Sequence, residues 1–260
     1  MSPQKDTPMK ASIIFSTHNK NWCLPNTLKA ISRQITSFPL EVCIVDDCST
    51  VDPAPIIKEF LPNAKYLRLE KHHNFLYAPN LCLDMVSDDT KIILPMSSDI
   101  IMLKENSVEL LCQGVSKKRV VFAEVSNIPV PDDAYLNFDE YAAPLINDWN
   151  SILQHSLKPL HVSRHLPTAW LFFLGAILKE DLLDIGYRDN SCDAVLWQKM
   201  AQQNFDGELL TTVPVLHQNH PRFDVSCPVA NTCNFYCSRT SENGRWKKQA
   251  PTIKPFDIIS

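Results

Sequence analysis

Two short runs of apolar residues, separated by a segment with helical spacing, open the chain. Residues 12–16 (SIIFS) and 41–45 (EVCIV) are apolar through their centres, as strands buried on both faces are. Residues 24–34 have the spacing of a helix, and the polar turn 17–21 precedes them. A strand, a helix and a second strand form a parallel unit, in which ligands bind outside the carboxyl ends of the strands. We therefore expect the polar residues at both strand ends to face one crevice.

The same alternation continues along the chain and predicts an α/β fold with a mostly parallel, open sheet flanked by helices. After residue 53 the pattern favours a helix in IIKEFLP, a strand in KYLRLE, a helix over 81–86 and an interrupted strand in KIILPMSSDIIML. Beyond residue 103 it favours a helix over 107–114, a strand in KKRVVFAEVS, and an apolar strand followed by Gly175 and a helix from Lys179. The segment SCDAVLWQKMAQQNF has the pattern of an amphipathic helix with Val195, Leu196 and Met200 inward. A last strand ends at His217.

Three aspartates stand at the ends of predicted strands. Asp46 and Asp47 follow the second strand, and Asp99 follows Ser97 and Ser98 where the later strand is interrupted. Each aspartate taken alone has another interpretation, as a solvated turn residue or a helix N-cap. Three of them at successive strand ends of one sheet favour a binding site.

Composition narrows the class of protein. The 260 residues, 45% of them hydrophobic, suffice for one large α/β domain or two packed halves. A net charge of −4 with mixed signs offers no basic field for nucleic acid, and no run of eighteen apolar residues offers a membrane span. The first ten residues lack the apolar core of a secretory signal, so we expect a disordered lead-in over 1–10 and a cytoplasmic protein.

The cysteine and glycine residues bear on the cellular compartment and on how a nucleotide could be bound. Nine cysteines without a CxxC pair read as mostly buried thiols in a reducing compartment. With five glycines the chain has neither GxGxxG nor GxxxxGK[ST], so a nucleotide must be held in another way. Two histidines and three cysteines cluster late in the chain, at His217, His220, Cys227, Cys233 and Cys237. Their spacing fits no standard zinc motif, and a cysteine-bearing loop over the site is the simpler interpretation.

Four blocks together resemble family-two inverting glycosyltransferases with the GT-A fold. The first is SIIFSTHNKN, LKAISRQ and EVCIVDDCST; the second is NFLYAPNLCL with IILPMSSDIIML, written as in rhamnosyltransferase-like members; the third is FFLGAILKEDLLDIGYRD with CDAVLWQKM; the fourth is VLHQNH. The blocks follow the family's order over residues 11–220. The resemblance implies a nucleotide-sugar-binding half over 11–103, merged with an acceptor-binding half over 104–260.

The resemblance also implies which residues bind the nucleotide sugar. His18 stands where the family often has a tyrosine that stacks on the base, and a flat imidazole can serve there. Asp47 matches the carboxylate that accepts a hydrogen bond from the base or ribose, with Asp46 as a possible substitute. The alternative for His18 is a surface histidine in a turn. The nucleotide-sugar residues implied by the match are Ser16, His18, Asn19, Asp46, Asp47, Asn74 and Ser98.

The matched motifs imply a metal ion and a catalytic base as well. Asp99 matches the last aspartate of the metal-binding Asp-x-Asp motif, whose first aspartate is replaced by Ser97, and His217 matches a late histidine that reaches the metal or diphosphate. Mn²⁺ or Mg²⁺ is the expected ion, because hard divalent cations take oxygen ligands. Asp193 matches the general base, although Cys192 replaces the acid before it. The alternatives are a helix-terminal carboxylate for Asp193 and a buried core histidine for His217.

The expected reaction is inverting transfer of a hexosyl or rhamnosyl group from a nucleoside diphosphate sugar to the hydroxyl of a glycan, lipid-linked or protein-linked acceptor. Two other classes stay open. A nucleotidyltransferase would want a glycine-rich turn after the first strand, which STHNKNW lacks. A catalytically weak nucleotide-sugar-binding module would explain Ser97 and Cys192.

Overall fold

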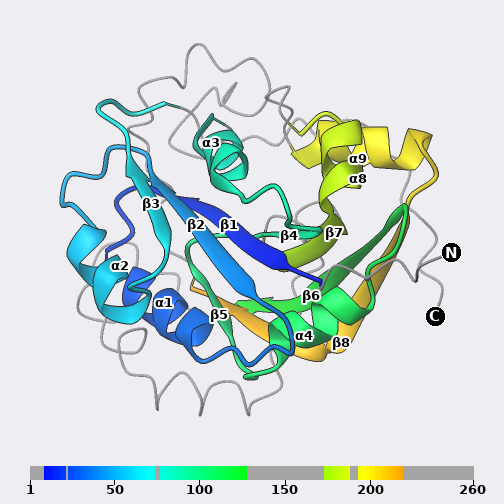
Figure 1. Ribbon diagram of the computed structural model, residues 1–260, viewed down its shortest axis with the longest axis horizontal. Coiled ribbons are helices and arrows are strands. Elements are labelled where there is room, and N and C mark those ends of the chain that lie inside the picture. The colour runs from blue at the N-terminus through cyan, green and yellow to red at the C-terminus, as the bar shows by residue number, and fades with distance from the viewer. Residues whose placement is uncertain (1–8, 22, 74–76, 128–172, 188–192, 219–260) are drawn as a thin grey trace, which may run out of the picture. The chain divides into compact units, whose positions relative to one another are not determined.

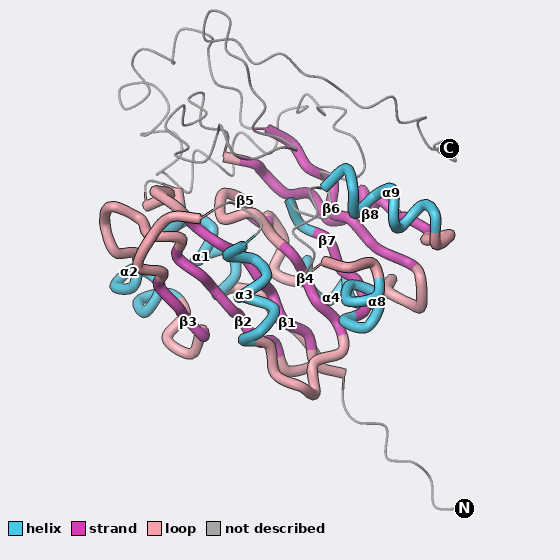
Figure 2. Tube along the Cα trace, turned by 90° about the horizontal axis from the view of Figure 1, so that it is seen from above, coloured by secondary structure: helices cyan, strands magenta, loops and turns pink. Residues whose placement is uncertain are grey.

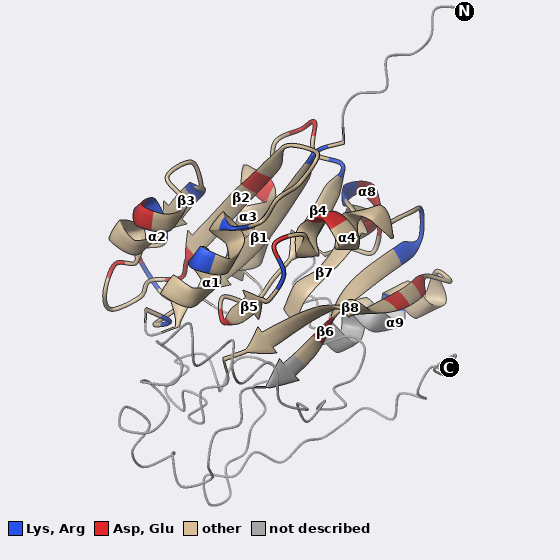
Figure 3. Cartoon of the chain, turned by 90° about the horizontal axis from the view of Figure 1, so that it is seen from below, with Lys and Arg blue, Asp and Glu red and all other residues tan. Residues whose placement is uncertain are grey.

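The computed structural model describes residues 9–21, 23–73, 77–127, 173–187 and 193–218 (Figure 1). The chain divides into two units, Met1–Phe223 and Asp224–Ser260, and every described residue belongs to the first. Within the described ranges, no helix combines the length and the apolar character needed to cross a membrane. Lys and Arg alternate with Asp and Glu over the helices and loops seen in Figure 3.

One eight-stranded sheet runs through the described residues, in the order β3-β2-β1-β4-β7-β6-β8-β5. Its first four strands are parallel, with β1 between β2 and β4. Strand β7 pairs antiparallel with both β4 and β6, and β5 pairs antiparallel with β8, whereas β6 and β8 are parallel. The expected mostly parallel α/β sheet is confirmed. The strands are β1 (Ala11–Thr17), β2 (Leu40–Asp46), β3 (Lys65–Arg68), β4 (Ile92–Pro95), β5 (Ile100–Met102), β6 (Arg119–Asn127), β7 (Gly175–Leu178) and β8 (Asp206–His217).

Helices cover both faces of the sheet (Figure 2). Residues of α1, α2 and α4 pack into one apolar cluster with Ile13 and Phe15 of β1, whereas residues of α3, α8 and α9 pack into another with Ile14. Successive residues of β1 are thus buried on opposite faces, which explains why its central residues, 13–15, are all apolar. The helices are α1 (Leu24–Ser32), α2 (Ala54–Phe60), α3 (Tyr77–Met85), α4 (Ser107–Gln113), α8 (Lys179–Asp184) and α9 (Asp193–Gln202).

Helix α1 shows how the local sequence fixes an element beside the site. Pro25 in the first turn needs no backbone donor, and Leu24, Leu28 and Ile31 form one buried face. The helix ends at Ser32, before the predicted Gln34, and the Gln34 side chain donates to the carbonyl groups of Ala30 and Lys104. These bonds turn the chain toward the segment before α4.

Most predicted elements are present, with boundaries that differ by a few residues, and the difference at Gly175 changes the interpretation of that residue. The structure places Gly175 as the first residue of β7, not after the strand as the pattern indicated. The first three residues of β7 are buried, so Gly175 lies inside the sheet and does not mark a turn. Leu196 and Met200 of α9 are buried as predicted, and the Val195 side chain lies outside the described part.

Candidate functional site

The turns that follow β1 and β2 interlock at the carboxyl ends of these adjacent parallel strands. The backbone N–H of Asn19 donates to Ser49 Oγ at 2.9 Å, and the Asn19 side-chain oxygen accepts from the N–H of Thr50 at 2.8 Å. Asn19 and Cys48 both adopt positive φ, 53° and 63°. Asparagine tolerates this left-handed conformation better than most residues, so it replaces glycine in the first turn. The polar ends predicted to meet do meet here.

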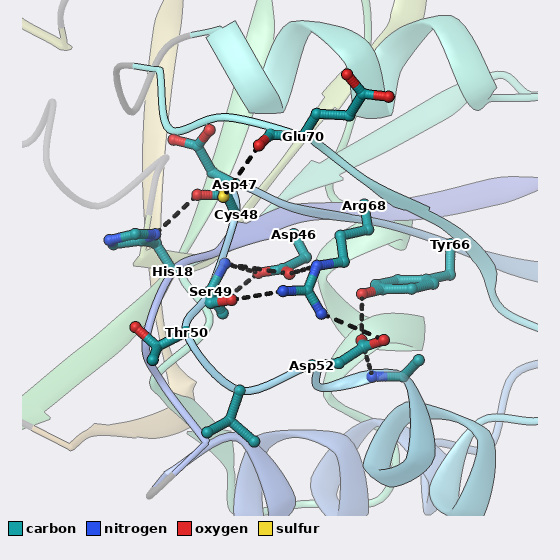
Figure 4. A network of polar contacts seen from close by, with 12 residues as sticks. His18, Asp46, Asp47, Cys48, Ser49, Thr50, Asp52, Tyr66, Arg68 and Glu70 are labelled. Atoms are coloured by element: carbon teal, nitrogen blue, oxygen red, sulfur yellow. Dashed lines mark hydrogen bonds and ion pairs between the residues drawn. The ribbon is translucent and has the colours of Figure 1, made fainter.

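Asp46 holds the second turn from inside (Figure 4). It is fully buried, and its carboxylate accepts hydrogen bonds from the backbone N–H of Ser49 at 3.1 Å and from Ser49 Oγ at 2.5 Å. Arg68 of β3 lies with Nε 3.5 Å from Asp46 Oδ2 and donates through Nη2 to the Ser49 carbonyl at 2.6 Å. This placement differs from the expectation that Asp46 could substitute for Asp47, because its carboxylate is committed to the turn.

Asp47 points instead to a group of histidines. Its Oδ2 lies 2.9 Å from His72 Nδ1, and its Oδ1 accepts from the backbone N–H of His73 at 2.9 Å. Its own backbone carbonyl accepts from His18 Nδ1 at 2.7 Å. The rings of His18 and His72 stack at 4.0 Å. His18 and Asp47 therefore lie together, as the sequence indicated, but the stacking partner of His18 in this structure is His72.

The contacts of His18 also fix its tautomer. Because a carbonyl oxygen can only accept, the bond to Asp47 requires the hydrogen of the neutral imidazole on Nδ1. His18 Nε2 is then the acceptor for the Asn19 side-chain amide, which lies at 3.1 Å. One turn thus orients both the imidazole and the amide beside Asp47.

Asp99 forms the second charged centre of the site, just before β5. Its Oδ2 lies 2.8 Å from Lys20 Nζ, and its Oδ1 accepts from Ser97 Oγ at 2.5 Å and lies 3.4 Å from His217 Nε2. Burial alone would raise the pKa of Asp99, but His217 and Lys20 outweigh it and hold that pKa well below its usual range. Asp99 is therefore an anion at neutral pH.

Helix α1 and the end of β8 fix the position of Asp99. Ile100 pairs with His217 in the antiparallel β5–β8 ladder, and the backbone N–H of Gln218 donates to the Asp99 carbonyl at 2.8 Å. The fully buried Gln218 side chain accepts from Asn26 Nδ2 at 3.1 Å. Buried Ser98 contributes its carbonyl, which accepts from Thr27 Oγ1 at 2.9 Å. The site thus joins both halves of the chain.

The donor set around Asp99 fits a divalent cation in its chemistry. A carboxylate, the Ser97 hydroxyl and the His217 imidazole can all ligate Mn²⁺, and an ion of this kind completes its shell with water and phosphate oxygens. In the described ranges no three His, Cys, Asp or Glu side chains are arranged to bind a metal. Lys20 also lies on Asp99 Oδ2, so a cation that used this oxygen would have to displace the ammonium group.

Some predicted site residues fall elsewhere. Ser16 pairs with Val45 in the β1–β2 ladder and is partly exposed. Asp193 is the first residue of α9, but its side chain lies outside the described part. Asn74 lies outside the described residues, as do His220 and the three cysteines of the late cluster.

The structure adds residues that the sequence interpretation passed over. Lys20 directly follows the predicted site residues His18 and Asn19, and His72 and His73 directly precede the predicted Asn74. Proximity in the sequence to predicted site residues could therefore have indicated these three. Arg68 lies inside a predicted strand and Gln218 after another. Their roles depend on contacts across the sheet, and no local pattern marks them.

Comparison with known proteins agrees with this architecture. The structure resembles S. aureus TarS (residues 1–349) with a TM-score of 0.53 and 17% identity, over 80% of this chain and 60% of that chain. It resembles GalNAc-T7 crystallised with UDP, GalNAc and Mn²⁺, with a TM-score of 0.57 and 16% identity, over 82% of this chain and 44% of that chain. It resembles the mannosyltransferase PcManGT from Pyrobaculum calidifontis, in complex with GDP-Man and Mn²⁺, with a TM-score of 0.52 and 17% identity, over 85% of this chain and 62% of that chain.

These likenesses show a GT-A-like fold, and the chain spans less than two thirds of each of these solved proteins. A comparison with curated protein sequences found no match. The profile of Glycosyl transferase family 2 matches residues 12–176, well over half of the chain, and this stretch contains the interlocked turns, Asp47 and Asp99. The chain belongs to Glycosyl transferase family 2.

Proposed function

We propose that the protein transfers a sugar from a nucleoside diphosphate sugar to an acceptor hydroxyl, with inversion at the anomeric carbon. The observation that carries the proposal is the turn from His18 to Lys20, which contacts Asp47 at one end and Asp99 at the other. One turn thus spans two carboxylates at the carboxyl edge of a parallel sheet, the usual place for a nucleotide in such folds. Family membership supports this assignment.

In this proposal the nucleoside binds at the Asp47 end. Asp47 accepts a hydrogen bond from the base or ribose, and His18 and Asn19 bind beside it. Ser16 and Asn74 are the further residues proposed to bind the nucleotide sugar. The His18–His72 stack gives the base a flat imidazole surface. Asp46 supports the site by holding the turn and does not contact the nucleotide.

The diphosphate binds at the Asp99 end in this proposal, together with Mn²⁺ or Mg²⁺. Asp99 and His217 would hold the ion, and Ser98, which directly precedes Asp99 in the chain, would bind the nucleotide sugar beside it. Such an ion supplies positive charge that stabilises the leaving diphosphate. Two solved proteins of similar fold were crystallised with Mn²⁺, which supports this choice of ion.

Asp193 is the proposed general base. It begins α9, where the helix dipole favours an ionised carboxylate, and only the ionised form can accept the acceptor's proton. The donor class is a hexose or rhamnose nucleotide. TarS was solved with UDP-GlcNAc and PcManGT with GDP-Man, so UDP and GDP sugars are the first donors to test.

A donor panel tests this function directly. Thermal unfolding is measured in the presence of Mn²⁺ and a UDP-, GDP- or dTDP-linked sugar. Donor hydrolysis is measured from the amount of nucleotide released. A donor present at a hundred times its dissociation constant should add about 2.7 kcal/mol to the free energy of unfolding. Binding with slow hydrolysis of one donor supports a transferase. Binding without hydrolysis or transfer to any acceptor supports the catalytically weak module, and no binding of any donor contradicts both.

A further inference from the structure

Lys20 occupies Asp99 Oδ2, one of the two carboxylate oxygens that a divalent cation could bind. Its ammonium group lies 2.8 Å from Asp99 Oδ2. The Asp99 side chain is 8% exposed, whereas the Lys20 side chain is 30% exposed. The carboxylate is thus buried, and the side chain that pairs with it is itself only partly exposed. An ammonium ion and a divalent cation repel each other at such range, so both cannot bind the same carboxylate oxygen.

Lys20 also lies between the two ends of the proposed donor. It directly follows His18 and Asn19, which contact Asp47 and the turn after β2, and its side chain ends at Asp99. A nucleotide bound between these ends would place its diphosphate beside the Lys20 ammonium. The flexible four-carbon stem of lysine allows the charge to move by several ångströms without movement of the backbone.

Charge balance favours an exchange of partners at this position. In the donor-free protein the Lys20 cation offsets the buried Asp99 anion. When a nucleoside diphosphate sugar enters with a divalent cation, the ion offsets the two diphosphate charges and Lys20 again offsets the remaining negative charge. Without Lys20 each state would lack one positive charge beside the buried Asp99 carboxylate, which is costly.

We propose, resting on the function proposed above, that Lys20 is a diphosphate-binding residue that competes with the divalent cation for Asp99. The ammonium group holds Asp99 while the donor is absent. It moves to the diphosphate oxygens when the cation and the donor arrive together. Lys20 thereby disfavours binding of the metal alone and favours binding of the metal with the nucleotide.

The exchange predicts opposite effects of one substitution on two ligands. Lys20→Met keeps the length of the side chain and removes its charge. Affinity for Mn²⁺ alone, measured from the electron paramagnetic resonance signal of the free ion, should rise about tenfold because the competitor is lost. Affinity for UDP or GDP in the presence of Mn²⁺, measured by calorimetry, should fall about ten- to a hundredfold, as expected for a lost charge-assisted hydrogen bond.

Three comparisons make the test specific. UMP and GMP lack the second phosphate and should bind Lys20→Met with less than about a threefold change in affinity. Lys20→Arg retains the charge and should recover most of the diphosphate affinity. Lys58→Met removes the same charge from an exposed position on α2 and should change neither ligand. Thermal unfolding of each variant shows whether it is folded.

Each failure has a distinct meaning. Weaker or unchanged Mn²⁺ binding by folded Lys20→Met overturns the competition for Asp99. Equal losses of affinity for diphosphate and monophosphate nucleotides in Lys20→Met overturn the diphosphate role. In that case, binding of UDP or GDP by the wild-type protein still leaves the proposed function intact. If the wild-type protein binds neither UDP nor GDP with Mn²⁺, the proposed function fails and the diphosphate role fails with it.

Discussion

Asp47 is the residue on which nucleotide binding should depend most directly. Its carboxylate is almost fully buried and faces His72 and the backbone N–H of His73. Asp47→Asn keeps the shape but replaces one acceptor oxygen with a donor amide. We expect the affinity for UDP or GDP to fall at least about tenfold, and the free energy of unfolding to fall by about 1–3 kcal/mol. Calorimetry and urea denaturation measure the two effects, and unchanged nucleotide affinity would remove Asp47 from the site.

Glu41 gives the fold a pH-dependent contribution away from the site. Burial would raise its pKa, but hydrogen bonds from Lys65, Ser87 and Ser12 outweigh it and lower that pKa to about 2, from 4.5. A carboxyl with a depressed folded-state pKa stabilises the protein above pH 4.5, and this stability is lost as the pH falls toward 2. After allowance for solvent screening, Glu41→Gln should lower the free energy of unfolding by about 1–2 kcal/mol at pH 7.

The pH profile of Glu41→Gln is the informative measurement. The difference from the wild type should shrink as the pH is lowered from 5 to about 2.5, because the wild-type carboxyl then becomes protonated. Glu59→Gln, at an exposed position on α2, serves as the control and should show no such convergence. A difference that stays constant with pH would mean that Glu41 acts through packing alone.

At the residue scale, the sequence could place His18, Asn19 and Asp47 together but could not separate the roles of the aspartate pair. Adjacent aspartates at a strand end look alike in a sequence. Their difference arises because Arg68, on the neighbouring strand β3, reaches Asp46, whereas the histidines after that strand reach Asp47. Such contacts join residues far apart in the chain and leave no local signal.

At the element scale, Arg68 connects β3 to the turn that carries Asp47. Its guanidinium bonds the Ser49 carbonyl and lies near the carboxylates of Asp46 and Asp52 (Figure 4). Arg68→Met should lower the free energy of unfolding by about 1–3 kcal/mol, because it leaves the buried Asp46 anion without its cation. Nucleotide affinity should fall as well, since the turn loses its support.

A matched control separates this effect from the loss of any arginine. Arg33 pairs with Glu105 at 2.7 Å, with both side chains about half exposed. Arg33→Met should therefore cost less than about 1 kcal/mol and leave nucleotide affinity unchanged. Equal stability losses in the two variants, measured by chemical denaturation, would show that Arg68 has no special role in the turn.

The elements themselves were predictable where their apolar pattern is long. Strands β1 and β2 are apolar through their centres because both of their faces are covered, and the structure extends each prediction by one residue at both ends. The direction of β7 was not predictable. Four residues, Gly175–Leu178, carry no signal that distinguishes parallel from antiparallel pairing, which is set by neighbours distant in the sequence.

At the scale of the whole molecule, the two predicted halves share one sheet. Strand β7 joins β4 of the first half to β6 of the second, and β5 of the first half pairs with β8 of the second. The second pairing brings His217 to Asp99, so neither half contains the complete site. In the proposed reaction, the acceptor would therefore approach a donor site to which both halves contribute.

The proposed base, Asp193, belongs to this scale because in the proposed reaction it would act on the acceptor while the donor is held by other elements. Helix α9 begins at Asp193, and its Leu196 and Met200 are buried in the cluster that also contains Tyr187 and Phe205. This packing anchors the helix and fixes where its first residue stands. A carboxylate at a helix N-terminus remains ionised at neutral pH, the state in which it can accept a proton.

Asp193→Asn should leave donor binding intact and reduce sugar transfer by about 10²- to 10⁴-fold, the usual contribution of a general base. The asparagine keeps the size of the side chain but cannot take the acceptor's proton. Donor affinity is measured by calorimetry and transfer by product formation, with Asp206→Asn, an exposed aspartate at the start of β8, as the control. If transfer by Asp193→Asn stays near the wild-type rate, another group must accept the proton. If donor affinity and transfer fall together, Asp193 acts in donor binding instead, because a base that acts only in the transfer step contributes nothing to the donor complex.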